Sequence, residues 1–163
     1  MRNGDRLILD EHVMDLILWR HAEAEEGFPD TLRKLTPKGL NQANRMAAWL
    51  KQKIPENTRI IVSPAIRTQQ TAQALQLNFI TDSTIGPGAG ADAILAAAHW
   101  PDASSAVLIV GHQPTIGEVA SYLISSIPAG LRVKKGSVWW IRSQLRDKTI
   151  ESELHAVMYP EDV

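Results

Sequence analysis

Residues 106–114 read AVLIVGHQP, and this stretch decides the predicted fold. Its first five residues are all apolar, which is typical of a strand buried on both faces, as in a parallel sheet. Gly111 and His112 follow the strand, and Pro114 is suited to the first turn of a helix. We therefore expect a buried strand here that leads directly into a helix.

The same succession occurs twice earlier in the chain. Residues 16–21 read LILWRH, and residues 59–64 read RIIVSP. A Thr-Pro pair at 36–37 and a Ser-Pro pair at 63–64 each supply an N-cap followed by proline, so a helix is predicted to start at both places. Strands that alternate with helices indicate an α/β fold with a mostly parallel central sheet, that is, a three-layer α/β/α sandwich.

The rest of the chain continues this pattern. The sequence predicts a short strand at 78–80, helices at 92–99 and 113–127, and final strands at 137–141 and 153–157. Trp139 and Trp140 are adjacent in one of these strands and should face opposite sides of the sheet. We expect residues 14–163 to form a single domain and residues 1–13 to form an N-terminal extension that is disordered or a mobile arm.

The composition excludes several classes of protein. The chain has 163 residues, with 17 Lys and Arg against 18 Asp and Glu, and so lacks the basic charge typical of nucleic-acid binding. It contains no cysteine, which removes disulfides, thiolate metal sites and cysteine nucleophiles. No apolar run reaches the ~18 residues of a membrane span. We expect a cytoplasmic protein without nucleic-acid or membrane partners, and the sequence leaves its oligomeric state open.

Chemically distinctive side chains follow three of the predicted strands. Arg20 and His21 follow the first strand, Arg67 lies one turn into the helix after the second, and His112 follows the strand at 106–110. Ligands bind beyond the carboxyl ends of parallel strands, so these side chains are expected to meet in one pocket. Arginine matches phosphate oxygens, and a neutral imidazole can attack phosphorus. The set therefore predicts phosphoryl chemistry, and two imidazoles without nearby carboxylates or cysteines argue against a bound metal.

Three segments around these residues resemble signatures of the histidine phosphatase (phosphoglycerate mutase-like) superfamily. Residues 16–24 resemble its RHG segment, residues 62–72 its SSPxxRxxQTA segment, and residues 107–114 its VGHNP segment. The short length and residues 33–39, which read RKLTPKG, resemble the small SixA-type phosphohistidine phosphatases. The resemblance runs from about residue 14 to the end, and it implies a phosphoglycerate mutase-like fold and a phosphatase activity.

The resemblance also implies a role for each matching residue. His21 would be the nucleophile that is transiently phosphorylated, and Arg20 and Arg67 would bind the phosphoryl oxygens. His112 would complete the pocket and stabilise the transition state. Arg33 would be a further phosphate-binding arginine, with a solvated loop arginine as the alternative. The resemblance implies no metal and no cofactor.

Two features depart from the family pattern. Ala22 stands where the family has the glycine of RHG, and we expect little loss because alanine is also small. Larger members carry an acidic proton donor in an insertion without counterpart here; Asp92 and Asp102 are weak candidates, and a helix cap or turn role is expected for each. A general acid contributes about 10²–10⁴-fold, and an alkoxide leaving group needs it more than the imidazole of phosphohistidine does. A phosphohistidine substrate is therefore favoured.

Three functions follow from these observations. The first is a metal-independent phosphatase that acts through a phosphohistidine intermediate on a phosphohistidine-containing (HPt-type) protein of a phosphorelay, which is a role in signal transduction. The second is a phosphatase of small phosphate esters. The third is a non-catalytic module that binds a phosphorylated partner, although such a module would not need His21 as a nucleophile. A mutase is less favoured, because it needs extra segments that retain a bisphosphate.

Overall fold

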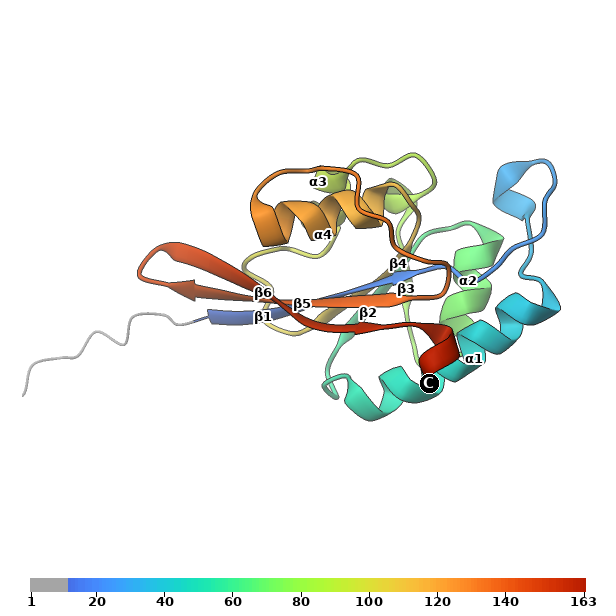
Figure 1. Ribbon diagram of the computed structural model, residues 1–163, viewed down its shortest axis with the longest axis horizontal. Coiled ribbons are helices and arrows are strands. Elements are labelled where there is room, and N and C mark those ends of the chain that lie inside the picture. The colour runs from blue at the N-terminus through green and yellow to red at the C-terminus, as the bar shows by residue number, and fades with distance from the viewer. Residues whose placement is uncertain (1–11) are drawn as a thin grey trace, which may run out of the picture.

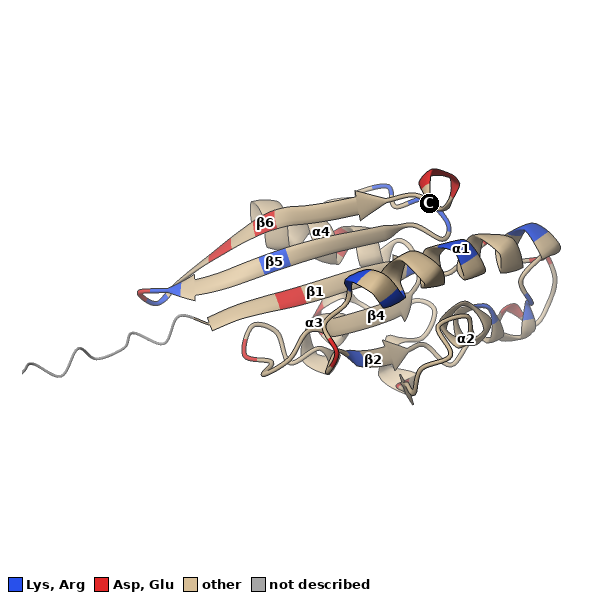
Figure 2. Cartoon of the chain, turned by 90° about the horizontal axis from the view of Figure 1, so that it is seen from below, with Lys and Arg blue, Asp and Glu red and all other residues tan. Residues whose placement is uncertain are grey.

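The structure is a computed structural model that describes residues 12–163, and these residues form one six-stranded mixed sheet (Figure 1). The strands are β1 (His12–Arg20), β2 (Arg59–Val62), β3 (Ile80–Thr81), β4 (Val107–Gly111), β5 (Val138–Arg146) and β6 (Thr149–Met158). Their order across the sheet is β3-β2-β4-β1-β5-β6, and Figure 2 shows β4, β1, β5 and β6 side by side. The first four strands in this order are parallel, and β5 and β6 are antiparallel to their neighbours.

Helices cover both faces of the sheet (Figure 1). They are α1 (Pro37–Lys53) and α2 (Ile66–Gln73) on one face, and α3 (Ala91–Ala97) and α4 (Thr115–Ser125) on the other. Short 3-10 turns are η1 (Asp30–Leu32), η2 (Ser83–Ile85) and η3 (Pro160–Asp162). The predicted three-layer α/β/α sandwich is confirmed. None of the helices in the described part of the chain is long and apolar enough to cross a bilayer.

Each face of the sheet packs its own apolar cluster against its own helices. Leu18 and Ile109 lie in the cluster beneath α3 and α4, whereas Trp19 lies in the cluster against α1 and α2. Trp139 packs against the first cluster and Trp140 belongs to the second, so the expected alternation of the two tryptophans is confirmed. Because β1, β2 and β4 are buried on both faces, their apolar runs made them readable in the sequence.

Three strands, β1, β5 and β6, are longer than their predicted apolar runs. β1 begins at His12, and residues 12 and 13 pair with β5, so this part of the expected extension belongs to the sheet. The remainder, residues 1–11, lies outside the described residues. β5 and β6 continue to a two-residue turn at Asp147 and Lys148, whose φ angles of 50° and 64° match a hairpin turn of type I′. The outer part of β6 is mostly exposed and the outer part of β5 is largely polar, so no apolar pattern marks this end of the hairpin.

The two predicted helix starts differ in outcome. Thr36 is the N-cap of α1, and its hydroxyl accepts a hydrogen bond of 2.9 Å from the Gly39 amide, as predicted. The expectation that Ser63 caps the next helix is wrong. α2 begins at Ile66 with Ala65 in the cap position, and the Ser63 hydroxyl is used instead in a contact with a buried histidine.

Gly39 lets α1 approach the backbone that follows β1. A Cβ atom at this position would lie 1.9 Å from the carbonyl oxygen of Glu23, a distance that no side chain can occupy. α1 therefore holds the segment after β1 by direct contact with its main chain.

We expect Gly39→Ala to lower the free energy of unfolding by about 2 kcal/mol, because the backbone of α1 or of Glu23 must move. In an unobstructed helix the same change would stabilise by up to about 1 kcal/mol. Urea denaturation measures the difference. Gly130→Ala is the matched control, because a Cβ there meets nothing within 4 Å, and it should change stability by less than about 0.5 kcal/mol. A stabilising effect of Gly39→Ala would contradict the close approach.

Candidate active site

The parallel register of three strands brings the predicted site residues to one edge of the sheet. β1 pairs with β4 so that Arg20 lies opposite Gly111, which makes His21 and His112 the next residues on adjacent strands. Ser63 follows the end of β2, on the other side of β4. The ring centroids of His21 and His112 are 5.4 Å apart, and both side chains are buried.

His21 is held as a neutral imidazole with one free nitrogen. Its Nδ1 lies 2.7 Å from the carbonyl oxygen of Ala22, an acceptor, so Nδ1 carries the proton and donates it. Nε2 has no hydrogen-bond partner among the described residues and keeps its lone pair. Burial lowers the pKa of His21 to about 3, and the charges of His112 and Arg67 act in the same direction. A neutral imidazole with a free nitrogen is able to act as a nucleophile at neutral pH.

Ala22 stands where the family pattern has glycine, and the surrounding structure accommodates its side chain. Its amide donates a 3.1 Å hydrogen bond to the hydroxyl of Thr71 in α2, so the carbonyl that orients His21 is held by a helix. Its side chain is fully buried in a small apolar cluster with Ala24, Leu35 and Ala43. The expected tolerance of alanine at this position has a structural basis in that cluster.

His112 is also buried and neutral. Its Nε2 lies 2.7 Å from the hydroxyl oxygen of Ser63, which itself accepts a hydrogen bond from the amide of Ala65. Burial and the charge of Arg67 lower the pKa of His112 to about 4. The Nδ1 atom of His112 is buried and has no partner among residues 12–163. Ser63 was missed as a site residue because its position suggested a helix cap.

The arginines present further unsatisfied donors at the same place. Arg67 lies in the first turn of α2 and is only 4% exposed, and Arg20 donates from Nη1 to the carbonyl of Val133 at 2.8 Å. In both side chains the Nε–H group is buried and lacks an acceptor in the described part of the chain. Buried donors are nearly always hydrogen-bonded in proteins. Together with Nδ1 of His112, these groups fit a ligand rich in acceptor oxygens.

Asp30 is part of the site and was not predicted. Its carboxylate forms ion pairs of 3.0 Å with Arg67 and with Arg33, and its backbone carbonyl accepts a second hydrogen bond from Arg67. Hydrogen bonds from Arg33 and then Arg67 lower the pKa of Asp30 below its usual value, so the group is ionised at neutral pH. Through Asp30 the predicted Arg33 is joined to the site. The signal in the sequence that could have indicated Asp30 is its spacing of one turn from Arg33.

The two weak candidates for a general acid are not joined to the site. Asp92 is exposed in the first turn of α3, and its carboxylate accepts a hydrogen bond from the amide of Ala93. Asp102 is exposed in a turn before β4, at the opposite end of that strand from His112. Neither forms a hydrogen bond or ion pair with a site residue. Asp102 occupies a turn, as expected, whereas Asp92 is the second residue of α3, whose N-cap is Gly90.

Comparison with known proteins identifies the family. Residues 16–85 match the model of the histidine phosphatase superfamily (branch 1). The phosphohistidine phosphatase SixA homolog of Haemophilus influenzae is 31% identical over 126 residues, which cover 68% of this chain and 77% of that protein. The chain belongs to the histidine phosphatase superfamily. It is therefore a hydrolase of the phosphatase class, as the sequence indicated.

Other members of the superfamily agree with this assignment. The phosphohistidine phosphatase SixA of Escherichia coli is 28% identical over 126 residues, covering 72% of this chain and 76% of that protein. The solved structure described as a putative SixA from Nakamurella multipartitia superposes with a TM-score of 0.77 at 28% identity, covering 91% of this chain and 97% of that one. The phosphoglycerate mutase-like fold expected from the motifs is confirmed.

The buried neutral histidines predict a loss of stability in acid. The unfolded chain takes up protons on its histidines near pH 6.5, whereas His21 and His112 stay neutral until about pH 3 and 4 in the folded protein. The unfolded state therefore binds more protons between these limits. The free energy of unfolding should fall as the pH falls from 6.5 to 4, by up to about 1.4 kcal/mol per pH unit for each histidine.

Urea denaturation at a series of pH values tests this slope. His112→Gln should make the slope shallower, because one of the two histidines that must charge on unfolding has been removed. His155→Gln, at an exposed position on β6, should leave it unchanged. Equal slopes for the wild type and His112→Gln would contradict a buried, neutral His112.

A second prediction concerns Asp30, whose carboxylate forms an ion pair with Arg67, an arginine that is expected to bind the phosphoryl group. Asp30→Asn should lower the dissociation constant of inorganic phosphate about threefold, because a competing negative charge is removed at a partly exposed position. Isothermal titration calorimetry measures this constant. Asp92→Asn is the matched control and should have no effect. Weaker binding by Asp30→Asn would mean instead that the carboxylate positions Arg67.

Proposed function

We propose that the protein hydrolyses phosphohistidine on a protein of a phosphorelay, through a phosphorylated His21 and without a metal ion. One observation carries the proposal. The free Nε2 of a neutral His21 lies in a site with three unsatisfied donors, on Arg20, Arg67 and His112. A phosphoryl group supplies acceptor oxygens for the donors and an electrophilic phosphorus for the nitrogen.

In the first step, Nε2 of His21 attacks phosphorus and the bond from phosphorus to the substrate imidazole breaks. Arg20 and Arg67 balance the charge on the transferring oxygens. The Ala65 amide occupies one lone pair of the Ser63 hydroxyl, so the hydroxyl proton is available to Nε2 of His112. The proton of His112 then resides on Nδ1, where it can be donated to a phosphoryl oxygen. In the second step, water attacks phosphorus, releases inorganic phosphate and regenerates His21.

The protonation state of the site favours a nitrogen leaving group. Within residues 12–163, Asp30 is the residue whose carboxylate forms ion pairs with side chains of the site. Arg33 and Arg67 keep this carboxylate ionised. An ionised carboxylate has no proton to give to a departing alkoxide, which would need it most. The imidazole of phosphohistidine can take up its own proton before it leaves. This difference supports phosphohistidine over a simple phosphate ester.

The donor set also supports chemistry without a metal. No cluster of three His, Asp or Glu side chains suited to a metal ion occurs in the described region. Arg20 and Arg67 act on both site imidazoles and Arg33 acts on His112, so these positive charges, opposed at His112 by Asp30, disfavour the binding of a cation. A phosphorelay target would give the enzyme a role in signal transduction in the cytoplasm.

The test is a turnover assay on a phosphohistidine phosphotransfer domain and, separately, on an aryl phosphate, each with and without a chelator. We expect chelator-resistant loss of phosphate from the protein substrate. His21→Ala should reduce this rate at least about 10³-fold, because the nucleophile is removed. When the wild-type reaction is quenched after a short time, an acid-labile phosphoryl group should be found on His21.

His155→Ala is the matched control for the loss of a histidine. Its ring lies on the exposed face of β6 against Trp140, far in the sequence from the site, and the variant should retain full activity. Turnover of the aryl phosphate alone would replace the proposal with a phosphatase of small esters. Phosphate binding without turnover of either substrate would leave a phospho-binding module. Loss of activity with chelator would refute the metal-free mechanism.

A further inference from the structure

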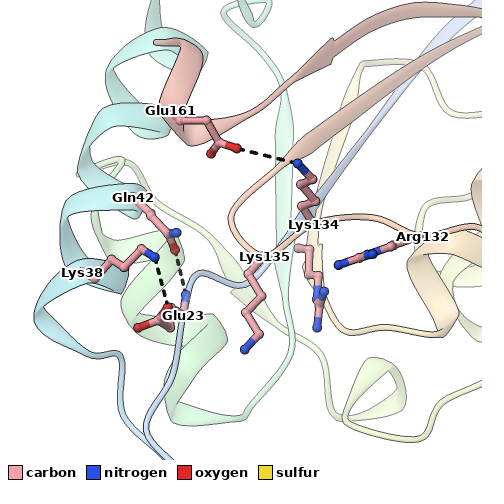
Figure 3. A pocket seen from close by; sticks show the side chains of 8 residues that line it. Glu23, Lys38, Gln42, Arg132, Lys134, Lys135 and Glu161 are labelled. Carbon is pink, nitrogen blue, oxygen red and sulfur yellow. Dashed lines mark hydrogen bonds and ion pairs between the residues drawn. The ribbon is translucent and has the colours of Figure 1, made fainter.

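A cationic cleft opens beside the candidate active site. Its volume is about 540 Å³, and it is bounded by the start of α1, the loop at 131–136 and η3 (Figure 3). Five cationic side chains and two acidic ones line it, although the chain as a whole has a formal net charge of -1. Arg20 lines this cleft and also belongs to the site, so a ligand in the cleft lies next to the phosphoryl position.

Three of the five cations, Arg20 among them, form no ion pair within the described residues. Lys38 pairs with Glu23 at 3.7 Å, and Lys134 pairs with Glu161 at 4.0 Å. Arg132 and Lys135 are exposed and form no ion pair or hydrogen bond within residues 12–163. Figure 3 shows both side chains at the cleft, with no dashed line to the other residues drawn.

The charge of Arg132 also reaches the active site. After burial, it is the next cause that lowers the pKa of Arg20, ahead of the charge of Arg67. Unbalanced positive charge therefore extends from the phosphoryl site into the cleft, where it favours an anionic group.

The loop that carries these cations is held by its main chain. Val133 is fully buried, and its carbonyl accepts the hydrogen bond from Arg20. The carbonyl of Leu131 accepts a 2.8 Å hydrogen bond from Gln113, at the start of α4. Gly117 permits this contact, because a Cβ there would lie 1.9 Å from the Leu131 oxygen. The cations are thus positioned before any ligand arrives, which lowers the entropic cost of binding.

We infer that this cleft binds acidic side chains that flank the phosphohistidine of a protein substrate, an inference that rests on the proposed function. On a helix, residues three and four positions apart are neighbours. Acidic residues one turn from a phosphohistidine would face Arg132 and Lys135 while the phosphoryl group lies at Arg20. Arg132 and Lys135 come from one loop, and Arg20 and Lys38 come from two other segments, so the spread of cations suits several carboxylates better than one small anion.

A second observation on another rim of the site supports a protein as the occupant. Phe28 is 96% exposed and Leu32 is 56% exposed, and both lie on the segment that carries Asp30 into the site. Exposed aromatic and aliphatic side chains beside a binding site are typical of surfaces that bind proteins. A small phosphate ester would gain nothing from them.

The test uses three phosphohistidine peptides of equal length, prepared with phosphoramidate. Positions three and four residues on either side of the phosphohistidine are Glu in one peptide, Gln in the second and Lys in the third. For the wild-type protein at low salt we expect kcat/KM to fall in that order, by about tenfold from Glu to Lys. The difference should lie in KM, with kcat changed less than about twofold, and high salt should reduce it.

The double variant Arg132→Gln, Lys135→Gln should reduce the preference to about twofold or less. The matched control removes two lysines from the far end of α1, Lys51→Gln and Lys53→Gln, and should keep the full preference. Equal kcat/KM for all three peptides with the wild type would overturn this inference and leave the proposed function intact. If the folded protein hydrolysed neither the peptides nor the phosphotransfer domain, both would fall. An unchanged preference in the Arg132, Lys135 variant would also overturn the assignment.

Discussion

The site depends on one constraint, which is the parallel register of β1 and β2 on either side of β4. β4 is buried along its whole length, so its hydrogen bonds on both edges are fixed by the core. The side-chain period of a strand is two, and a slip of one residue would turn His21 to the opposite face. The apolar clusters on both faces forbid that slip. Packing far from the chemistry therefore determines where the imidazoles stand.

The electrostatics of the site follow from that placement. His21 and His112 are buried close together beside Arg20 and Arg67, so a proton on either ring would add charge to an already cationic, poorly solvated region. Both rings therefore stay neutral, which leaves each with one N–H donor and one nitrogen lone pair. The same arrangement leaves buried N–H groups without acceptors, a cost that an anionic ligand removes. The site gives up some stability in exchange for affinity.

Sequence reasoning succeeded where the signal is local. The buried strands are continuous apolar runs, and the residues that follow them were predicted to meet. It failed where contacts join distant segments. Asp30 reaches Arg67 across 37 positions, and no spacing rule points to that pair. Ser63 was assigned to a cap because its neighbours resemble one, although its hydroxyl bonds His112 on another strand. The outer half of the β5–β6 hairpin was missed because most of its β6 residues are exposed and its β5 residues, from Ser143 to Arg146, form no apolar run.

The way in which the loop at 131–136 is attached has an evolutionary consequence. Its anchors are main-chain atoms and the buried Val133, whereas the side chains at 132, 134 and 135 are exposed and line the cleft. Substitutions at these three positions can alter the charge that the surface offers without disturbing the hydrogen bonds to Arg20 or to α4. Duplicated copies of such an enzyme could thus diverge in partner choice through a few codons while the chemistry stays the same. The side chains proposed to recognise the substrate are therefore different from those proposed to act in catalysis, although the two groups are neighbours.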